Sequence, residues 1–168
     1  PARANLGPGT YALTLSDGKH SIQLNARDKA GWVYSMEQSF KVDTTVPTLN
    51  IQTTLPDWTS GSFTMNGTAD DPGQASSGLS KVEVSTDGGQ TWQTTTGNTS
   101  WSYTWDTNES SSGTYVVHTR ATDNAGLTTQ QTFTVGVDNN APKISLPDSW
   151  YQWDTVTLDI WDNHSGLS

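Results

Sequence analysis

The sequence contains no cysteine, and only three glutamates and five lysines stand among its 168 residues. Without cysteine, neither a disulfide framework nor a thiolate metal site can form, and the redox compartment cannot be inferred from disulfide bonds. Scarce Glu and Lys, combined with abundant Thr, Ser, Gly, Asn and Asp, favour strands and turns over helices. We therefore expect almost no helix.

Long apolar segments are also missing. Hydrophobic residues make up 32% of the chain, the mean hydropathy is −0.60, and no run reaches the roughly 18 apolar residues of a membrane-spanning helix. No signal peptide is visible at Pro1. These features predict thin β layers, no membrane insertion, and a soluble segment cut from a longer protein.

Positively charged residues are also few. Seventeen acidic residues, fourteen of them Asp, outnumber eight Lys and Arg, which gives a formal net charge of −9. This excess repels polyanions, so we expect no nucleic-acid partner. Cations are the expected counterparts.

Short motifs recur along the chain. "ARDKAG" (26–31) returns as "ATDNAG" (121–126), and "FKVDTTVP" (40–47) is echoed by "FTVGVDNNAP" (133–142). Four residue pairs share one spacing of 95 residues: Asp28 and Asp123, Gly31 and Gly126, Asp43 and Asp138, Pro47 and Pro142. In a second register, "LPDW" (55–58) resembles "LPDSW" (146–150), and "SGLS" (77–80) returns at 165–168. Such spacing indicates an internal repeat.

The repeat predicts three pieces. Residues 1–45 would be the C-terminal half of one domain, 46–140 a complete domain, and 141–168 the N-terminal part of a further one. Period-two alternation in the complete domain predicts seven strands, the fourth of them a short one running through Trp92, and this pattern is typical of an antiparallel β-sandwich. The residues predicted to face its interior are Phe63, Met65, Val82, Val84, Tyr115, Val117, Phe133 and Val135.

These motifs resemble the bacterial Ig-like repeats of long secreted and surface proteins, including giant adhesins. The resemblance rests on the D-x-A-G motif, the alternating strand before Val42-Asp43, the following T-x-P, and "SGLSKVEVSTDGGQTW" (77–92). It implies an all-β fold of Ig-like antiparallel β-sandwich repeats in tandem. It does not specify the role, because such repeats serve as stalks, enzyme spacers and envelope components.

The stretch "STDGGQTW" (85–92) also resembles the Asp-box of sialidases and related propellers. A hairpin explains it fully: Asp87 would bond turn N–H groups, glycines would supply positive φ, and Trp92 would cover the corner. Sialidase chemistry requires an arginine cluster and a Tyr nucleophile, whereas this chain has three arginines in all. No nucleophile elbow, phosphate loop or paired-histidine motif occurs either. We therefore predict a structural hairpin, no catalytic residues and no enzyme activity.

Calcium is the specific chemical hypothesis. Carboxylates, Asn carbonyls and backbone oxygens in Gly-rich loops suit a hard cation with six to eight ligands. Oxygen-bearing residues at expected strand ends give the candidate ligands Asp70, Asp71, Asp123, Asn124, Asp138 and Asn140. The resemblance to Ig-like adhesins, which often brace their junctions with calcium, adds Asp43 and Asp138 as linker ligands. The alternative is that these residues merely cap turns.

Eight tryptophans are unusual for so polar a chain. Trp101, Tyr103 and Trp105 would share one face of a strand. That face either packs inside the sandwich or, if it points outward, forms a sugar-stacking platform.

The leading hypothesis is a non-enzymatic stalk, spacer or fibre subunit of an extracellular or cell-surface bacterial protein. Its partners would be other Ig-like repeats of the same chain or of neighbouring subunits, with surface glycans as a further option. The alternative is a carbohydrate-binding or spacer module of a secreted glycoside hydrolase.

Overall fold

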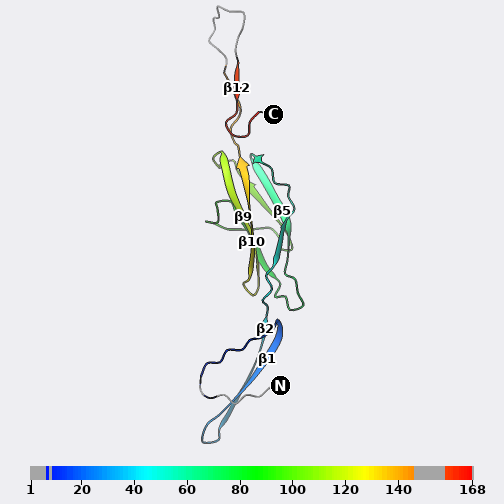
Figure 1. Ribbon diagram of the computed structural model, residues 1–168, viewed down its shortest axis with the longest axis vertical. Coiled ribbons are helices and arrows are strands. Elements are labelled where there is room, and N and C mark those ends of the chain that lie inside the picture. Colours follow the sequence, from blue (N-terminus) through cyan, green and yellow to red (C-terminus); the bar gives the residue numbers. More distant parts are fainter. Residues whose placement is uncertain (1–6, 8, 146–157, 168) are drawn as a thin grey trace, which may run out of the picture.

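The computed structural model describes residues 7, 9–145 and 158–167, and every regular element among them is a β-strand. A hairpin, a central group of strands and a second short strand pair follow one another along the long axis (Figure 1). The described part of the chain contains no helical segment capable of crossing a bilayer. "LPDSW" (146–150) and Arg3 lie outside the described residues.

The central unit consists of two sheets. The larger has the strand order β4-β10-β9-β6-β7, and the smaller has the order β3-β5-β8. All neighbours are antiparallel except β4, which runs parallel to β10. The strands are β3 (Thr48–Ile51), β4 (Trp58–Thr59), β5 (Ser62–Asp70), β6 (Leu79–Ser85), β7 (Gln93–Thr94), β8 (Ser100–Asp106), β9 (Gly113–Asp123) and β10 (Thr128–Val137). The predicted all-β sandwich is confirmed.

The core lies between these two sheets. Six of the eight residues predicted to face inward are buried, and Tyr115 and Phe133 are partly buried against them. Trp101 and Trp105 of β8 add the largest rings, with 2% and 6% of their surface exposed. Alternation along each strand therefore located the core correctly, since successive side chains point to opposite faces of a sheet.

Gly67 allows the largest core ring to lie close to β5. It pairs with Trp101 across the β5–β8 ladder. A Cβ at Gly67 would lie 2.0 Å from the Asn50 carbonyl oxygen and 2.6 Å from the Trp101 ring. Glycine is required here because a side chain would overlap both neighbours.

Two details differ from the sequence prediction. Strand β4 was not expected, because two residues are too short to show alternation. The short strand predicted to run through Trp92 is β7, which begins at Gln93, because Asp87 holds residues 86–92 in a longer turn.

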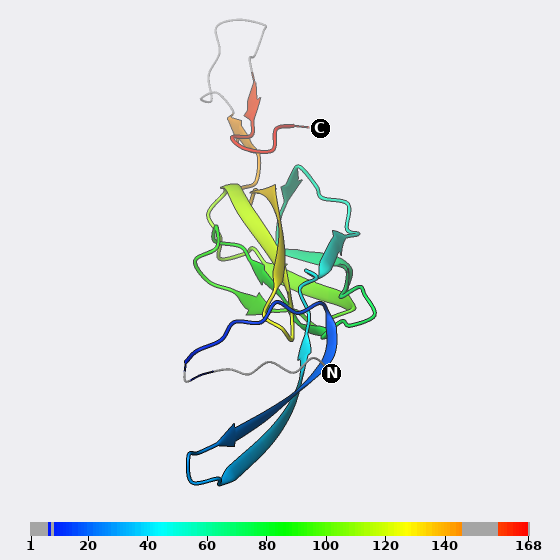
Figure 2. The same ribbon diagram turned by 60° about the horizontal axis from the view of Figure 1, so that its bottom comes forward.

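Two further strand pairs flank the sandwich. At one end β1 (Gly18–Arg27) and β2 (Val33–Val42) form a hairpin, which projects away from the central strands in Figure 2. At the other end β11 (Lys143–Ser145) pairs with β12 (Asp159–Trp161). The described part of the chain pairs neither with a further strand.

The flanking pairs repeat the register of the central unit. Gly18 faces Val42 in the hairpin, just as Gly113 faces Val137 between β9 and β10. Likewise, Ile144 faces Ile160 where Leu49 faces Ala69 between β3 and β5. The hairpin is therefore the counterpart of β9–β10, and β11–β12 is the counterpart of β3–β5.

Candidate metal centre

Three carboxylates meet where the hairpin joins the sandwich. Asp43 lies in the linker directly after β2, Asp71 directly follows β5, and Asp123 is the last residue of β9. One oxygen from each lies within 4.8 Å of the others. Residues distant in sequence are brought together because β5 and β9 end at the pole of the sandwich where the linker enters. We call these residues the acidic junction.

Two of these oxygens are buried without a hydrogen-bond partner. Asp71 is 8% exposed and Asp123 is 2% exposed. Asp71 Oδ1 and Asp123 Oδ2 have no partner among the described residues. Buried polar groups are nearly always satisfied, so each of these two oxygens is expected to bind a water molecule or a cation.

The remaining oxygens are bonded to the surrounding loops. Asp71 Oδ2 accepts hydrogen bonds from Gly78 N at 2.7 Å and Ser76 Oγ at 2.8 Å. Asp123 Oδ1 accepts one from Leu127 N at 2.8 Å. These bonds fix both carboxylates against their loops and leave one oxygen of each without a hydrogen-bond partner among the described residues.

Asp43 ties the linker to the sandwich. Its Oδ2 accepts a hydrogen bond from Ser77 N at 2.6 Å and its Oδ1 one from Thr45 N at 3.1 Å. The bonds from Ser77, followed by that from Thr45, lower the pKa of Asp43 below its ordinary value of 3.8. Its carboxylate is therefore charged at neutral pH.

Like charges at this spacing repel one another. At 4.8 Å and an effective dielectric constant of about 20, the repulsion between the Asp71 and Asp123 carboxylates is about 3 kcal/mol. A cation bound between them would replace this repulsion with attraction. Oxygens that share one Ca²⁺ at 2.3–2.6 Å lie at most about 5 Å apart, so the spacing fits calcium. The acidic junction can therefore hold a metal ion.

The structure distributes the predicted calcium ligands among different places. Asp71 and Asp123 belong to the acidic junction, together with the linker residue Asp43. The side chain of Asp70 is exposed, outside the cluster. Asn124 instead donates hydrogen bonds through Nδ2 to the carbonyl oxygens of Ser77 and Gly78 at 2.9 and 3.0 Å.

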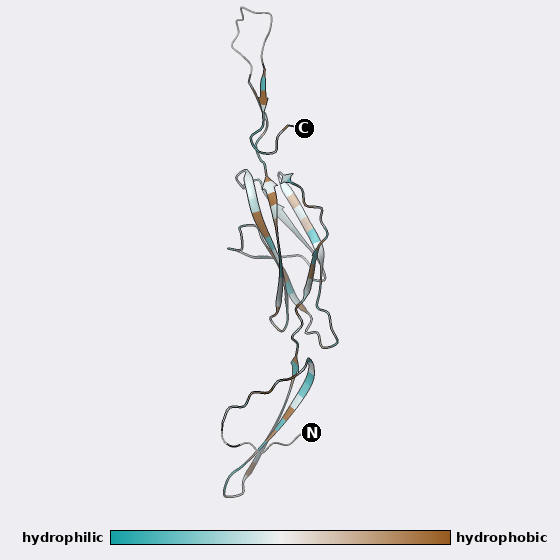
Figure 3. Cartoon of the chain, viewed as in Figure 1, coloured by the Kyte–Doolittle hydropathy of each residue, from teal (hydrophilic) through white to brown (hydrophobic). Residues whose placement is uncertain are grey.

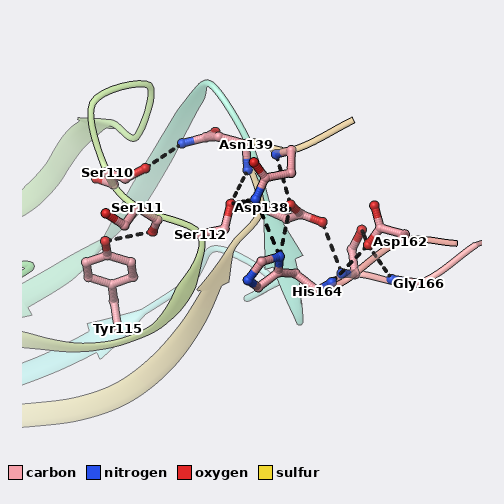
Figure 4. A network of polar contacts seen from close by, with 11 residues as sticks. Ser110, Ser111, Ser112, Tyr115, Asp138, Asn139, Asp162, His164 and Gly166 are labelled. Atoms are coloured by element: carbon pink, nitrogen blue, oxygen red, sulfur yellow. Dashed lines mark hydrogen bonds and ion pairs between the residues drawn. The ribbon is translucent and has the colours of Figure 1, made fainter. Parts of the chain in front are cut away.

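Asp138 and Asn140 lie at the pole of the sandwich opposite to Asp123. Strand β10 runs antiparallel to β9, so the chain leaves the sandwich at the end far from Asp123. Asp138 there accepts hydrogen bonds from the backbone N–H groups of Asn140 and Ser165, each at 3.0 Å (Figure 4). Hydrogen bonds from the Ser165 side chain and the Asn140 backbone, followed by the Ser165 backbone, lower the pKa of Asp138 to about 2.

This second junction repeats the bonding of the first. Asp138 binds Asn140 N and Ser165 N as Asp43 binds Thr45 N and Ser77 N. Asp162 accepts a hydrogen bond from Gly166 N at 3.0 Å, as Asp71 does from Gly78 N. Sequence reasoning missed Asp162, although the recurrence of "SGLS" after it carried the signal.

The Asp87 carboxylate of the Asp-box is hydrogen-bonded by residues of its own turn. Asp87 accepts hydrogen bonds from Ser85 Oγ at 2.7 Å, Gln90 N at 3.0 Å and Thr91 N at 2.9 Å. The Thr91 hydroxyl, then the Thr91 backbone, hold the pKa of Asp87 well below 3.8. The Arg120 guanidinium lies over the Trp92 ring, with 4.0 Å between its central carbon Cζ and the ring centroid. These contacts are those of a structural corner.

The sugar-platform alternative for Trp101, Tyr103 and Trp105 is wrong. Both tryptophans are buried in the core, and Tyr103 is partly buried against it. The β8 face that carries them is the inner face of the smaller sheet, so their rings are not available for stacking on a sugar.

Comparison with known proteins agrees with this architecture. Residues 99–164 match the bacterial Ig-like domain family (group 3). The bacterial Ig-like resemblance is thus confirmed for that segment, which runs from just before β8 through β12 and includes Asp138, Asn140 and Asp162. No curated protein matches the chain.

Two solved structures are similar to this chain. The protocadherin gammaB4 extracellular domain shares 19% identity at a TM-score of 0.34, with 76% of this chain and 22% of that chain covered. The protocadherin gammaB7 EC3-6 cis-dimer shares 15% identity at a TM-score of 0.36, with 89% and 41% covered. This chain therefore spans less than half the length of either.

Proposed function

We propose that this chain is a non-enzymatic rod segment of an extracellular bacterial Ig-like protein, in which calcium at the acidic junction fixes one unit to the next. The observation that carries the proposal is the pair of buried, unpartnered oxygens of Asp71 and Asp123 beside the linker carboxylate of Asp43. An ion held there would connect the linker with two loops of the sandwich. The role is mechanical, as a stalk, spacer or fibre subunit.

The contacts around the linker support a stiff connection. Asp17, just before β1, accepts hydrogen bonds from Thr44 N at 3.0 Å and Thr44 Oγ1 at 2.9 Å. On the sandwich side, Pro47 is fully buried and its carbonyl oxygen accepts a hydrogen bond from the Thr129 hydroxyl. Proline also fixes φ, which removes one degree of freedom from a short connection. Few residues in the linker remain free to bend.

Calcium fits this role better than zinc or magnesium. The acidic junction offers carboxylate oxygens and no imidazole or thiolate, which zinc prefers. Magnesium needs oxygens at 2.0–2.1 Å in near-ideal octahedral geometry, whereas calcium tolerates irregular cages completed by carbonyls and water. The net charge of −9 further favours a divalent cation.

The test is a comparison of calcium with chelator. Calcium that binds only the folded chain should raise Tm as the site saturates, because stabilisation follows RT ln(1 + [Ca²⁺]/Kd). Isothermal titration should give a saturable site, and small-angle scattering should show a narrower distribution of lengths with calcium. Asp71→Asn should abolish most of the calcium-induced rise in Tm.

Asp70→Asn is the matched control. It removes the same charge from the neighbouring residue, whose side chain is exposed outside the acidic junction, so its calcium response should equal that of the unchanged chain. Identical melts of the unchanged chain in calcium and chelator would refute calcium bracing. A calcium response lost equally in both variants would refute the assignment to this cluster.

A further inference from the structure

One side chain extends the contact between two loops of the acidic junction. The β6–β9 ladder ends at the pair Leu79 and Asp123, and its register shifts just inside that end. The strongly apolar residues of the central unit lie mainly on its strands (Figure 3). Beyond the end of the ladder, hydrogen bonds therefore hold the loop before β6 against the turn after β9.

Asn124 and the residue after it make these hydrogen bonds. The side-chain Nδ2 of Asn124 donates to the carbonyl oxygens of Ser77 at 2.9 Å and Gly78 at 3.0 Å. Its backbone N donates to the same Gly78 oxygen at 2.9 Å, and Ala125 N donates to Ser77 Oγ at 3.1 Å. An amide NH₂ group carries two hydrogens, so asparagine can bind both carbonyl oxygens at once.

The segment that Asn124 holds also binds two of the three carboxylates. Ser77 N donates to Asp43 at 2.6 Å, and Gly78 N donates to Asp71 at 2.7 Å. The third carboxylate belongs to the residue directly before Asn124 in the chain. One short network of hydrogen bonds thus connects all three carboxylates of the acidic junction.

The turn itself does not require asparagine at this position. The hairpin turn after β1 forms the same kind of bonds: Trp32 N donates to Asp28 Oδ1 at 2.9 Å, and Gly31 N donates to the Asp28 carbonyl oxygen at 3.1 Å. The residue after Asp28 is Lys29, where the central unit has Asn124. The side chain of Asn124 therefore serves the contact with the neighbouring loop rather than the turn.

We infer that Asn124 is a positioning residue of the acidic junction, which holds Asp123 at a fixed spacing from Asp71 and Asp43 and thereby sets the affinity for calcium. This inference rests on the proposed calcium role. Carboxylates that share one calcium ion must place their oxygens 2.3–2.6 Å from it, so the spacing between the two loops decides how well they bind. Asn124 acts through these loops and supplies no ligand oxygen of its own.

Asn124→Ala tests this role directly. The position is exposed, and alanine keeps the backbone bond to the Gly78 oxygen while it removes the two side-chain bonds. The calcium Kd, measured by isothermal titration, should rise about 10–100-fold, the usual effect of losing a residue that orients metal ligands. An unaltered Kd would overturn the inference.

Asn98→Ala is the matched control. Asn98 Nδ2 donates to the Ser80 carbonyl oxygen at 3.2 Å, so this variant also removes a bond from an asparagine side chain to a carbonyl oxygen, outside the acidic junction. Both variants should lower Tm in chelator, because each loses hydrogen bonds. Only Asn124→Ala should lose calcium affinity, and an equal loss in both variants would assign the effect to general stability and refute a positioning role.

Asn124→Asp separates positioning from direct ligation. Aspartate has nearly the shape of asparagine, but a carboxylate cannot donate to the two carbonyl oxygens. If residue 124 supplied a ligand oxygen, the added negative charge would strengthen calcium binding, because affinity rises with the charge of the ligands. A positioning role predicts weaker binding than in the unchanged chain, and tighter binding would contradict it.

A measurement without metal keeps this inference separate from the proposed function. In chelator, hydrogen exchange followed by NMR should be faster at the Ser77 and Gly78 amides in Asn124→Ala than in Asn98→Ala, because their segment has lost a contact. Equal exchange in the two variants would overturn the positioning role. An unchanged chain that binds no calcium would overturn both proposals, whereas calcium binding that is lost in Asp71→Asn but intact in Asn124→Ala would overturn the positioning role alone.

Discussion

Asp123→Asn should have opposite effects with and without calcium. In chelator, the substitution removes one of two buried like charges that lie within 4.8 Å. The repulsion is about 3 kcal/mol at an effective dielectric constant of about 20, so a gain of about 1–3 kcal/mol is expected. The amide keeps an oxygen for Leu127 N, and its NH₂ group replaces the Asp123 oxygen that has no hydrogen-bond partner among the described residues.

Thermal unfolding followed by circular dichroism measures both effects. A gain of about 1 kcal/mol in the free energy of unfolding raises the Tm of a domain as small as residues 46–140 by about 4–8 °C. The variant should therefore have a measurably higher Tm in chelator. In calcium, the loss of an anionic ligand should shrink the ion-induced stabilisation, which is about 2.7 kcal/mol at 100 times Kd for an intact site. The two melting curves of the variant should therefore lie closer together than those of the unchanged chain.

Asp70→Asn again supplies the comparison, because it changes the net charge equally at an exposed neighbour. The electrostatic reasoning would be refuted if Asp123→Asn melted earlier than the unchanged chain in chelator. The metal reasoning would be refuted if the variant kept the full calcium response.

Three further predictions concern the rest of the fold. Gly67→Ala should destabilise the sandwich by about 3 kcal/mol or more, seen in urea melts, because the new methyl overlaps the Asn50 carbonyl oxygen and the Trp101 ring; an unchanged midpoint would contradict this packing. Asp87→Ala should lower Tm by freeing the turn around Thr91, while a fluorogenic sialidase assay reads background before and after; activity that disappeared with Asp87 would reverse the structural interpretation. Asp138, with a folded pKa of about 2 against an ordinary value of 3.8, stabilises the fold fully above about pH 4, and this contribution disappears as the pH falls toward 2. In the Asp138→Asn variant, Tm should therefore fall less between about pH 4 and pH 2 than in the unchanged chain. A variant whose Tm falls as steeply as that of the unchanged chain would contradict this role of Asp138.

The fold class and most of the core could be predicted from local sequence patterns. Alternation in segments such as Phe63 to Met65 and Val82 to Val84 needs only the two-residue period of a strand, which is a local property. The 95-residue spacing of Asp28 and Asp123 likewise predicted equivalent turns, and both residues make the same bond to a backbone N–H four residues later. The hydrogen-bonded turn at the Asp-box was predicted correctly because its hydrogen bonds span only Ser85 to Thr91.

Which carboxylates lie close together could not be predicted in this way, because it depends on how distant strands pack. Asp70 and Asp71 are adjacent in sequence, yet strand alternation exposes one and buries the other at the junction. Asp123 and Asp138 were both candidate calcium ligands at expected strand ends, and the antiparallel course of β9 and β10 places them at opposite poles. Burial of the Trp101 ring against β5 depended on Gly67 in that neighbouring strand. The residues of the acidic junction converge through register and chain direction between distant strands, and those pairings are fixed by the packed core rather than by any local stretch of sequence.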